Sequence, residues 1–348
     1  MVRLMTKRPT IAVVARAAQV SPATVDRVLS GRMKVREETA RKVHEAAEAV
    51  GYHAAGAIRQ RLLSDRPELK LGVVLQKERH AFYQDVRQEF ETQARAMMTR
   101  NVKLDIRFAQ TTRPQELAEI LRGMKGRVQA VASTGIDHHE VTSAVAELRE
   151  AGIPTFSLLS DFAQGVRESY FGTNNLKLGR TAGWLISKIA PRPGKIGLFI
   201  GAHRYHGHEL RETGLRSFFR ELGGGFELLE TQVNLETREL TYEATSEMLS
   251  RHPDFAGLYV AGGGMEGAIA AVEEQRAPGE IALLVNELTP ESYQGLQKGV
   301  VSIVFGTPLR PMVTDLLTLA ASTIENGMAE TPGQRFFPPR IYTPESLS

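Results

Sequence analysis

The chain has 348 residues, of which 42% are hydrophobic and 24% are charged, and it contains no cysteine, which excludes disulfides, thiolate zinc sites and cysteine nucleophiles. No apolar run approaches the roughly 20 residues of a membrane span, and the first residues lack the apolar core of a secretion signal, so we expect a cytoplasmic protein without membrane contact. Residues 1–66 carry a net charge of +7 and the remaining residues −4, and basic charge gathered at one end is typical of proteins that bind a phosphate backbone.

Residues 10–30 predict two short helices separated by a tight turn. Apolar residues fall at helical spacing before the turn and repeat that spacing after it. We expect Ser21 to cap the second helix and Pro22 to occupy its first turn, where the missing N–H costs nothing. Two such helices with a polar outer face are typical of the helix-turn-helix unit, whose second helix enters the major groove of DNA. The apolar positions are Ile11, Val14, Ala15, Ala18, Val25, Val28 and Leu29.

Residues 31–52 predict a basic loop and a third amphipathic helix that stops at Gly51. Together with residues 10–30, this segment closely resembles the N-terminal domain of the lactose-repressor (LacI/GalR) family. The resemblance implies a transcription regulator, a repressor, that binds double-stranded operator DNA of palindromic sequence as a homodimer. An ordinary three-helix bundle with a solvated basic face is the alternative. The resemblance rests on Thr10, Ile11, Val14, Ala15, Ala18, Val20, Ser21, Thr24, Val25, Arg27, Val28, Leu29, Val35, Arg36, Thr39, Val43, Gly51 and Tyr52.

The second helix of this unit is expected to read the DNA sequence. Arg27 is placed to donate to a base edge or a phosphate, while Pro22 and Ala23 shape an apolar contact. Phosphate would repel the carboxylate of Asp26, so we expect Asp26 to accept from a cytosine amine or to orient Arg27. The DNA-binding residues expected in this region are Thr10, Ser21, Pro22, Ala23, Thr24, Asp26, Arg27, Arg32 and Arg36.

Residues 53–66 join this unit to the rest of the chain and are helix-competent from Ala54 to Leu63. A segment this short is not a stable helix alone in water, so we expect it to fold when two copies pair. The family resemblance implies a hinge helix that inserts Leu62 or Leu63 into the minor groove, with Arg59 and Arg61 on phosphates. Counting from Tyr52 places Arg61 at the leucine position instead, and a flexible linker is the alternative.

From Leu69 onward, short apolar runs alternate with longer amphipathic segments, which predicts a parallel, doubly wound α/β sheet. Two runs of such units, about 70–160 and 165–297, suggest two lobes with a cleft at the carboxyl ends of the strands. We therefore expect a helix-turn-helix domain at 1–52, a hinge helix or linker at 53–69, and a two-lobed effector-binding and dimerisation domain at 70–348. The expected strands are 71–75, 103–108, 128–132, 154–157, 196–200, 226–229, 257–260, 281–285 and 301–305.

This region resembles the effector domain of the same family, which shares the periplasmic-binding-protein fold and binds a small sugar, polyol or nucleobase between its lobes. The resemblance implies an aromatic loop that stacks on the ligand and an acid after the third strand. The chain departs from the family where Glu209 replaces a ligand-clamping Arg and Asn286-Glu287 replaces an aromatic-Asp pair. Packing under a helix, helix capping and solvation are the alternatives at these positions. The expected effector residues are Phe82, Tyr83, Asp137, Asn174, Glu209, Arg211, Gly263 and Glu287.

Two further motifs suggest other chemistry. Residues 262–267 satisfy G-x-G-x-x-G between a strand and a helix, so an α/β enzyme with a nucleotide cofactor is the alternative function. The motif lies in the middle of the second lobe rather than at a first βα unit, and we expect neither enzyme activity nor a cofactor. Histidines at 138–139 and 203–208 lack the spacing and partners of a zinc site, and we expect no metal.

Overall fold

The computed structural model describes residues 8–31, 35–64 and 66–347. The chain divides into two compact units, a head unit of residues 1–69 with 94–103 and a body unit of residues 70–93 with 104–348. None of the described helices is long and apolar enough to cross a membrane.

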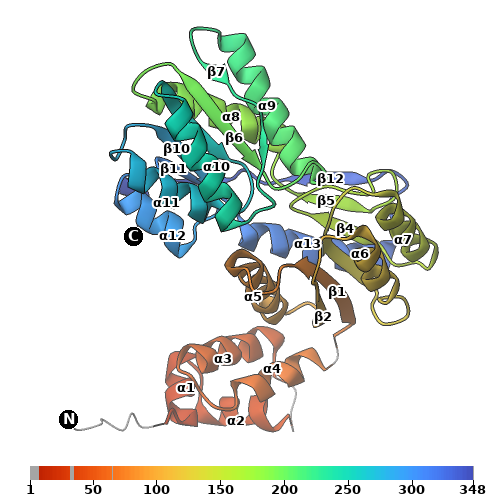
Figure 1. Cartoon of the computed structure of the whole chain (residues 1–348). Helices are drawn as coiled ribbons and strands as arrows, with labels where there is room; N and C mark the ends of the chain where they lie inside the picture. The colour runs from red at the N-terminus through yellow and green to blue at the C-terminus, as the bar shows by residue number, and fades with distance from the viewer. Residues whose placement is uncertain (1–7, 32–34, 65, 348) are drawn as a thin grey trace. The chain divides into compact units, whose positions relative to one another are not determined.

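The head unit contains α1 (Ile11–Ala17), α2 (Pro22–Ser30), α3 (Glu37–Ala49) and α4 (Ala55–Leu63) (Figure 1). α2 starts as the sequence predicts, because Ser21 Oγ accepts the Thr24 N–H at 3.2 Å and Pro22 follows. α2 ends at Gly31, whose φ of 65° suits a residue without a side chain. One apolar core holds these helices together, and its fully buried members include Val14, Val25, Val43, Ala47 and Ile58.

The segment after Tyr52 is already helical in a single copy of the chain, which differs from the expectation that it folds on pairing. The physical reason is that Ile58 on α4 is fully buried in the core that α1, α2 and α3 also form. Leu62 packs partly against the same core. Tertiary packing of one apolar face therefore stabilises a helix that is too short to persist alone.

The first lobe of the body is a six-stranded sheet in the order β12-β5-β4-β3-β1-β2. The strand pairs β1–β3, β3–β4, β4–β5 and β5–β12 are all parallel, as βα alternation predicts. Its elements are β1 (Glu68–Gln76), α5 (Ala81–Ala96), β2 (Asn101–Ala109), α6 (Pro114–Arg122), β3 (Ala130–Thr134), α7 (His139–Glu150), β4 (Thr155–Leu158), β5 (Ser169–Gly172) and, from the chain's end, β12 (Gly333–Phe336).

The second lobe is a sheet in the order β13-β11-β10-β9-β6-β7, with β8 paired to β6. Its elements are α8 (Asn175–Ile189), β6 (Lys195–Ile200), α9 (His206–Leu222), β7 (Glu227–Leu228), β8 (Gln232–Val233), α10 (Arg238–Arg251), β9 (Phe255–Val260), α11 (Met265–Gln275), β10 (Ala282–Asn286), α12 (Pro290–Gln297), β11 (Ile303–Gly306) and β13 (Arg340–Tyr342). α13 (Leu309–Asn326) follows β11 and leads to β12.

The sequence predicted two consecutive runs of units, but the chain passes between the lobes three times. It leaves the first sheet after β5, returns through α13 to β12, and then pairs β13 antiparallel with β11 in the second sheet. β5, β8, β12, β13 and α12 were not predicted. β12 and β13 are short and largely exposed, so they lack the buried apolar run that marked the other strands.

Two glycines bring α8 and α9 into close contact. A Cβ on Gly179 would lie 2.0 Å from the carbonyl oxygen of Arg211, and a Cβ on Gly214 would lie 2.2 Å from that of Leu176. Backbone atoms cannot move aside as a flexible side chain can. The contact therefore fixes the first turns of α9, from which Arg211 projects.

Replacing Gly179 by Ala should destabilise the body unit by at least about 1–3 kcal/mol, because the added methyl group overlaps the backbone of α9. Urea unfolding of the purified chain measures the change. Gly165→Ala is the matched control, since a Cβ there has no neighbour within 4 Å. Equal stability of the two variants would contradict this account of the α8–α9 contact.

Candidate functional site

A cavity lies between the two lobes, lined from both sides by residues that follow the carboxyl ends of strands. The arrangement follows from the parallel sheets, because parallel strands present all their carboxyl ends at one edge. The first lobe contributes Gln76, His80, Phe82, Tyr83, Thr134, Gly135, Leu158, Leu159 and Ser160, and the second lobe contributes Tyr205, Gly207, His208, Arg211, Glu236, Gly262, Gly263, Met265, Asn286 and Glu287. Thr173 and Thr307 line it where the chain passes between the lobes.

Five of the expected effector residues line this cavity: Phe82, Tyr83, Arg211, Gly263 and Glu287. The structure places the other three outside the lining. Asp137 is exposed, and its backbone N–H donates to the carbonyl of Arg204 at 3.1 Å. Asn174 caps α8 by accepting the Lys177 N–H at 3.0 Å, and Glu209 is exposed on the first turn of α9.

Glu236, which the sequence did not reveal, is the most strongly compensated charge at the cavity. Its carboxylate pairs with the ammonium of Lys77, and Oε1 accepts the Gly263 N–H at 3.2 Å. Burial raises the pKa of Glu236, but the charge of Lys77 and the hydrogen bonds from Lys77 and Gly263 act in the opposite direction, and the pKa is lowered. Glu236 is therefore an ionised hydrogen-bond acceptor. It follows β8, a strand of two residues that leaves no pattern in the sequence.

His208 lies beside Glu236, with Nε2 at 3.9 Å from Oε1. Nδ1 accepts the Gly201 N–H at 3.1 Å, which places the proton of the neutral ring on Nε2, toward the carboxylate. Burial lowers the pKa of His208 to about 4, against the opposing charge of Glu236. The imidazole is therefore neutral over the physiological pH range.

Glu287 supplies a second carboxylate, held entirely within the second lobe. Oε2 accepts the Thr307 N–H at 3.0 Å and Oε1 accepts the Thr307 hydroxyl at 2.6 Å. Burial raises the pKa of Glu287, although the hydrogen bonds from Thr307 act in the opposite direction. Nearby, Nε of Arg211 donates to Oδ1 of Asn175 at 2.7 Å. The cavity thus offers two carboxylates and one guanidinium beside the aromatic rings of Phe82 and Tyr83.

Backbone strain gathers around this cavity. Lys77, Leu159, Leu235, Glu236 and Glu287 all adopt the left-handed region, with φ between 47° and 67°. Residues other than glycine seldom adopt this region, and those that do cluster at ligand clamps. Three of the five line the cavity, and the other two adjoin it in the chain or by ion pairing.

The glycine-rich motif at 262–267 has a packing role in this fold. A Cβ on Gly262 would lie 2.7 Å from the ring of His208, and one on Gly263 would lie 3.0 Å from Cβ of Glu236. Gly264 has a φ of 86°, and a Cβ on Gly267 would lie 2.1 Å from the carbonyl of Arg238 on α10. Each glycine of the motif is thus explained by a side chain, a turn or a helix packed against it.

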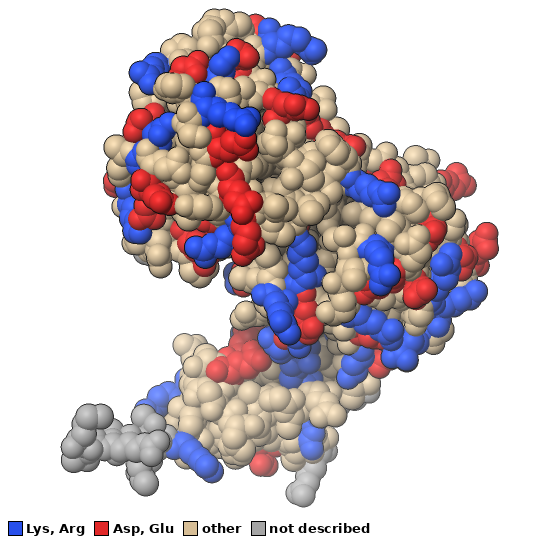
Figure 2. Space-filling view, in the orientation of Figure 1, with Lys and Arg blue, Asp and Glu red and all other residues tan. Residues whose placement is uncertain are grey.

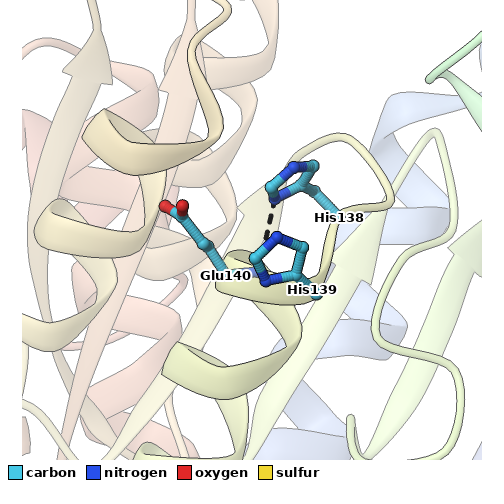
Figure 3. A group of neighbouring side chains, drawn as sticks. All are labelled: His138, His139 and Glu140. Atoms are coloured by element: carbon cyan, nitrogen blue, oxygen red, sulfur yellow. Dashed lines mark hydrogen bonds between the residues drawn. The ribbon is translucent and has the colours of Figure 1, made fainter.

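His138, His139 and Glu140 lie together at the start of α7, with their potential ligand atoms within 4.8 Å of one another (Figure 3). His138 caps the helix, because its Nδ1 accepts the Glu140 N–H at 3.3 Å. Glu140 accepts from Gln115 at 2.9 Å. The positive end of the helix dipole also disfavours a cation at this place. Capping therefore accounts for the arrangement.

The head unit presents the predicted reading face. Pro22, Ala23, Asp26 and Arg27 are exposed on α2, and Thr24 is half-buried beside the capping Ser21. Thr10 and Arg36 are exposed, whereas Arg32 lies outside the described residues. By contrast, acidic and basic side chains are mixed over the visible face of the body unit (Figure 2).

The three expected hinge residues differ in their surroundings. Arg59 donates to the carbonyls of Ala94 and Arg95 at 3.0 and 2.9 Å, inside the head unit. Arg61 is exposed, and Leu62 is half-buried.

Comparison with known proteins agrees with this division. Residues 71–327 match the family model described as periplasmic binding protein domain, and residues 10–54 match that described as bacterial regulatory proteins, lacI family. No curated protein matches the chain.

Solved structures share the fold of the body. A solute binding protein of an ABC transporter from Burkholderia graminis, in complex with D-arabinose, superimposes with a TM-score of 0.73 at 19% identity, over 80% of this chain and 96% of that one. One from Actinobacillus succinogenes with bound D-allose gives 0.70 at 18%, over 80% and 98%. GanP, a glucose-galactose binding protein from Geobacillus stearothermophilus, gives 0.73 at 18%, over 81% and 99%.

The buried neutral His208 predicts a pH dependence of stability. Its pKa is about 4 in the folded chain and about 6.5 when unfolded, so the unfolded chain binds more protons between these values. Stability should therefore be fully present above pH 6.5 and fall as the pH drops toward 4, by up to about 3 kcal/mol from this group. Urea unfolding across this range measures the loss.

His208→Asn keeps an acceptor for the Gly201 N–H and removes the titrating ring, so its stability should vary less with pH than that of the unmodified chain. His139→Asn, at an exposed histidine, is the control and should leave the slope unchanged. Identical slopes for all three proteins would show that His208 titrates normally.

Proposed function

Since the chain belongs to the lacI family of bacterial regulatory proteins and carries a periplasmic binding protein domain, we propose that it represses transcription under the control of a small molecule bound between its lobes. The observation that carries the proposal is the presence, in one chain, of an exposed α2 and a charged, aromatic-lined interlobe cavity. Residues 1–52 bind DNA, residues 53–69 form the hinge, and residues 70–348 bind the effector and dimerise.

The proposed target is a palindromic operator bound by a homodimer. One chain offers a single recognition helix, which reads one half-site, and two-fold symmetry in the protein is matched by a palindrome in the DNA. Arg59 and Arg61 of the hinge are proposed to contact phosphates and Leu62 the minor groove. Because Arg59 and Leu62 are engaged within the head unit, DNA binding requires their side chains to rearrange.

The proposed effector is a sugar or a polyol. Hydroxyl groups can donate to Glu236 and Glu287 and accept from Arg211, while C–H faces stack on Phe82 and Tyr83. Two similar folds are recorded with D-arabinose and D-allose, which supports this class of ligand. The nucleotide-enzyme alternative rested on the glycine motif, whose glycines have packing or turn roles in this fold.

Arg27→Ala should lower operator affinity by about 1–3 kcal/mol, because α2 loses its exposed guanidinium contact to a base edge or phosphate. The operator is first obtained by selecting bound sequences from random duplex DNA with the full chain, and affinity is then titrated at fixed salt. Arg220→Ala, at an exposed arginine of the body unit, is the control. An Arg27→Ala variant that binds as tightly as the control would remove Arg27 from the interface.

Glu287→Gln should abolish or weaken at least tenfold the response of operator binding to effector, while leaving operator affinity intact. The reason is that the charge is lost inside the cavity, in a unit separate from the DNA-reading helices. The response is measured as a shift in operator affinity across a panel of neutral aldoses and polyols that includes D-arabinose and D-allose. Asp137→Asn, outside the cavity lining, is the matched control. A normal response from Glu287→Gln together with a lost response from Asp137→Asn would reverse the assignment.

A further inference from the structure

The two lobes meet through polar contacts beside the cavity. Each of these contacts joins a residue of the first lobe to one of the second. The neutral contacts among the described residues include these: Tyr205 Oη donates to Gln76 Oε1 at 3.0 Å, the Asp137 N–H to the Arg204 carbonyl at 3.1 Å, the Gly207 N–H to Ser160 Oγ at 3.2 Å, and Asn175 Nδ2 to Tyr170 Oη at 3.2 Å. Another is the ion pair between Lys77 and Glu236.

This ion pair differs from the exposed pairs on the rest of the body. The side chain of Lys77 is 27% exposed and that of Glu236 is 14% exposed, so water screens their attraction only in part. A surface pair such as Arg251 with Glu247, 71% and 56% exposed, is screened far more strongly. Of the contacts between the lobes described above, the Lys77–Glu236 pair is the one that joins two opposite charges.

Glu236 is held in place by its own lobe. Gly201, Gly262 and Gly263 lack the side chains that would occupy its space, since Cβ atoms there would lie 2.5 to 3.2 Å from atoms of Glu236. The Glu236 N–H donates to Oδ1 of Asn234 at 2.9 Å, and the carboxylate accepts from Gly263. Because all these partners belong to the second lobe, they remain when the lobes separate.

Lys77 is presented from the opposite side. It follows the last residue of β1 in a left-handed conformation with a φ of 47°, and its carbonyl accepts the His80 N–H at 2.8 Å. This turn leads into the loop that carries Phe82 and Tyr83. Movement of the first lobe against the second thus changes both the Lys77–Glu236 distance and the position of the Phe82 and Tyr83 rings relative to the second lobe.

We propose that Lys77 and Glu236 form a closure latch, an ion pair that holds the two lobes together over the cavity and sets the balance between closed and open forms. His208 cannot replace Lys77 in this role, because its ring is neutral near pH 7 and it belongs to the same lobe as Glu236. This proposal rests on the proposed function in one respect: the molecule bound in the cavity is taken to be an effector.

The test measures the distance between the lobes directly, without DNA or a sugar. The chain has no cysteine, so spin labels can be attached at Lys125→Cys in the first lobe and Glu243→Cys in the second, both exposed. Pulsed electron paramagnetic resonance then gives the distribution of distances between the two spin labels in the full chain. Lys77→Met and Glu236→Gln should each raise the open population relative to the closed one by about tenfold.

Two further variants make the result decisive. The double exchange Lys77→Glu with Glu236→Lys should restore the closed distribution, because the pair is re-formed with its charges reversed. Lys195→Met breaks the Lys195–Glu227 pair within the second lobe and should leave the distribution unchanged. Single variants with the unmodified distribution would overturn the latch, and so would a double exchange that stays as open as the single variants. Loss of DNA binding or of a sugar response would bear on the proposed function and not on this result.

Discussion

Three crossings of the chain between two sheets of mainly parallel strands are the constraint on which the cavity depends. Each sheet presents its carboxyl ends on one edge, and the crossings after β5, β11 and β12 keep those edges facing each other. Thr173 and Thr307 lie at two of these crossings and also line the cavity. Neither lobe holds a complete site. A rotation of one lobe against the other at the crossings therefore also changes the distances between the residues that line the cavity.

The two carboxylates of the cavity are compensated in different ways. Glu287 takes both its hydrogen bonds from Thr307, which lies at a crossing, and its partners stay with the second lobe. Glu236 takes its counter-charge from Lys77 on the other lobe. Separation of the lobes therefore alters the electrostatics around Glu236 and leaves those around Glu287 largely as they were. For a ligand that contacts both carboxylates, Glu287 is an acceptor whose surroundings stay the same, whereas the surroundings of Glu236 depend on closure of the lobes.

The sequence predicted what local patterns determine. The head helices follow from apolar spacing and from the Ser21-Pro22 start, and the buried strands follow from apolar runs such as β3 and β10. Loop direction was not predictable: Asp137 follows β3 as expected, yet its side chain faces solvent. Glu236 was missed because its position depends on a two-residue strand and on glycines distant in the sequence. Such placement arises from tertiary contacts, which cannot be read from the amino-acid sequence of one protein.

The glycines around Glu236 have an evolutionary consequence. Gly201 and Gly263 border the side chain of Glu236, whereas a Cβ on Gly262 would meet the ring of His208 first, at 2.7 Å, and Glu236 at 3.2 Å. A related chain with a short residue at position 236 would be released from that requirement at Gly201, where the added Cβ would lie 2.5 Å from Cγ of Glu236. It would not be released at Gly263, where the added Cβ would lie 3.0 Å from Cβ of residue 236. Positions 201 and 236 should therefore vary together among relatives. The three glycines that resemble a nucleotide-binding fingerprint thus have separate packing reasons: Gly262 borders His208 and Glu236, Gly264 forms a turn, and Gly267 packs against α10.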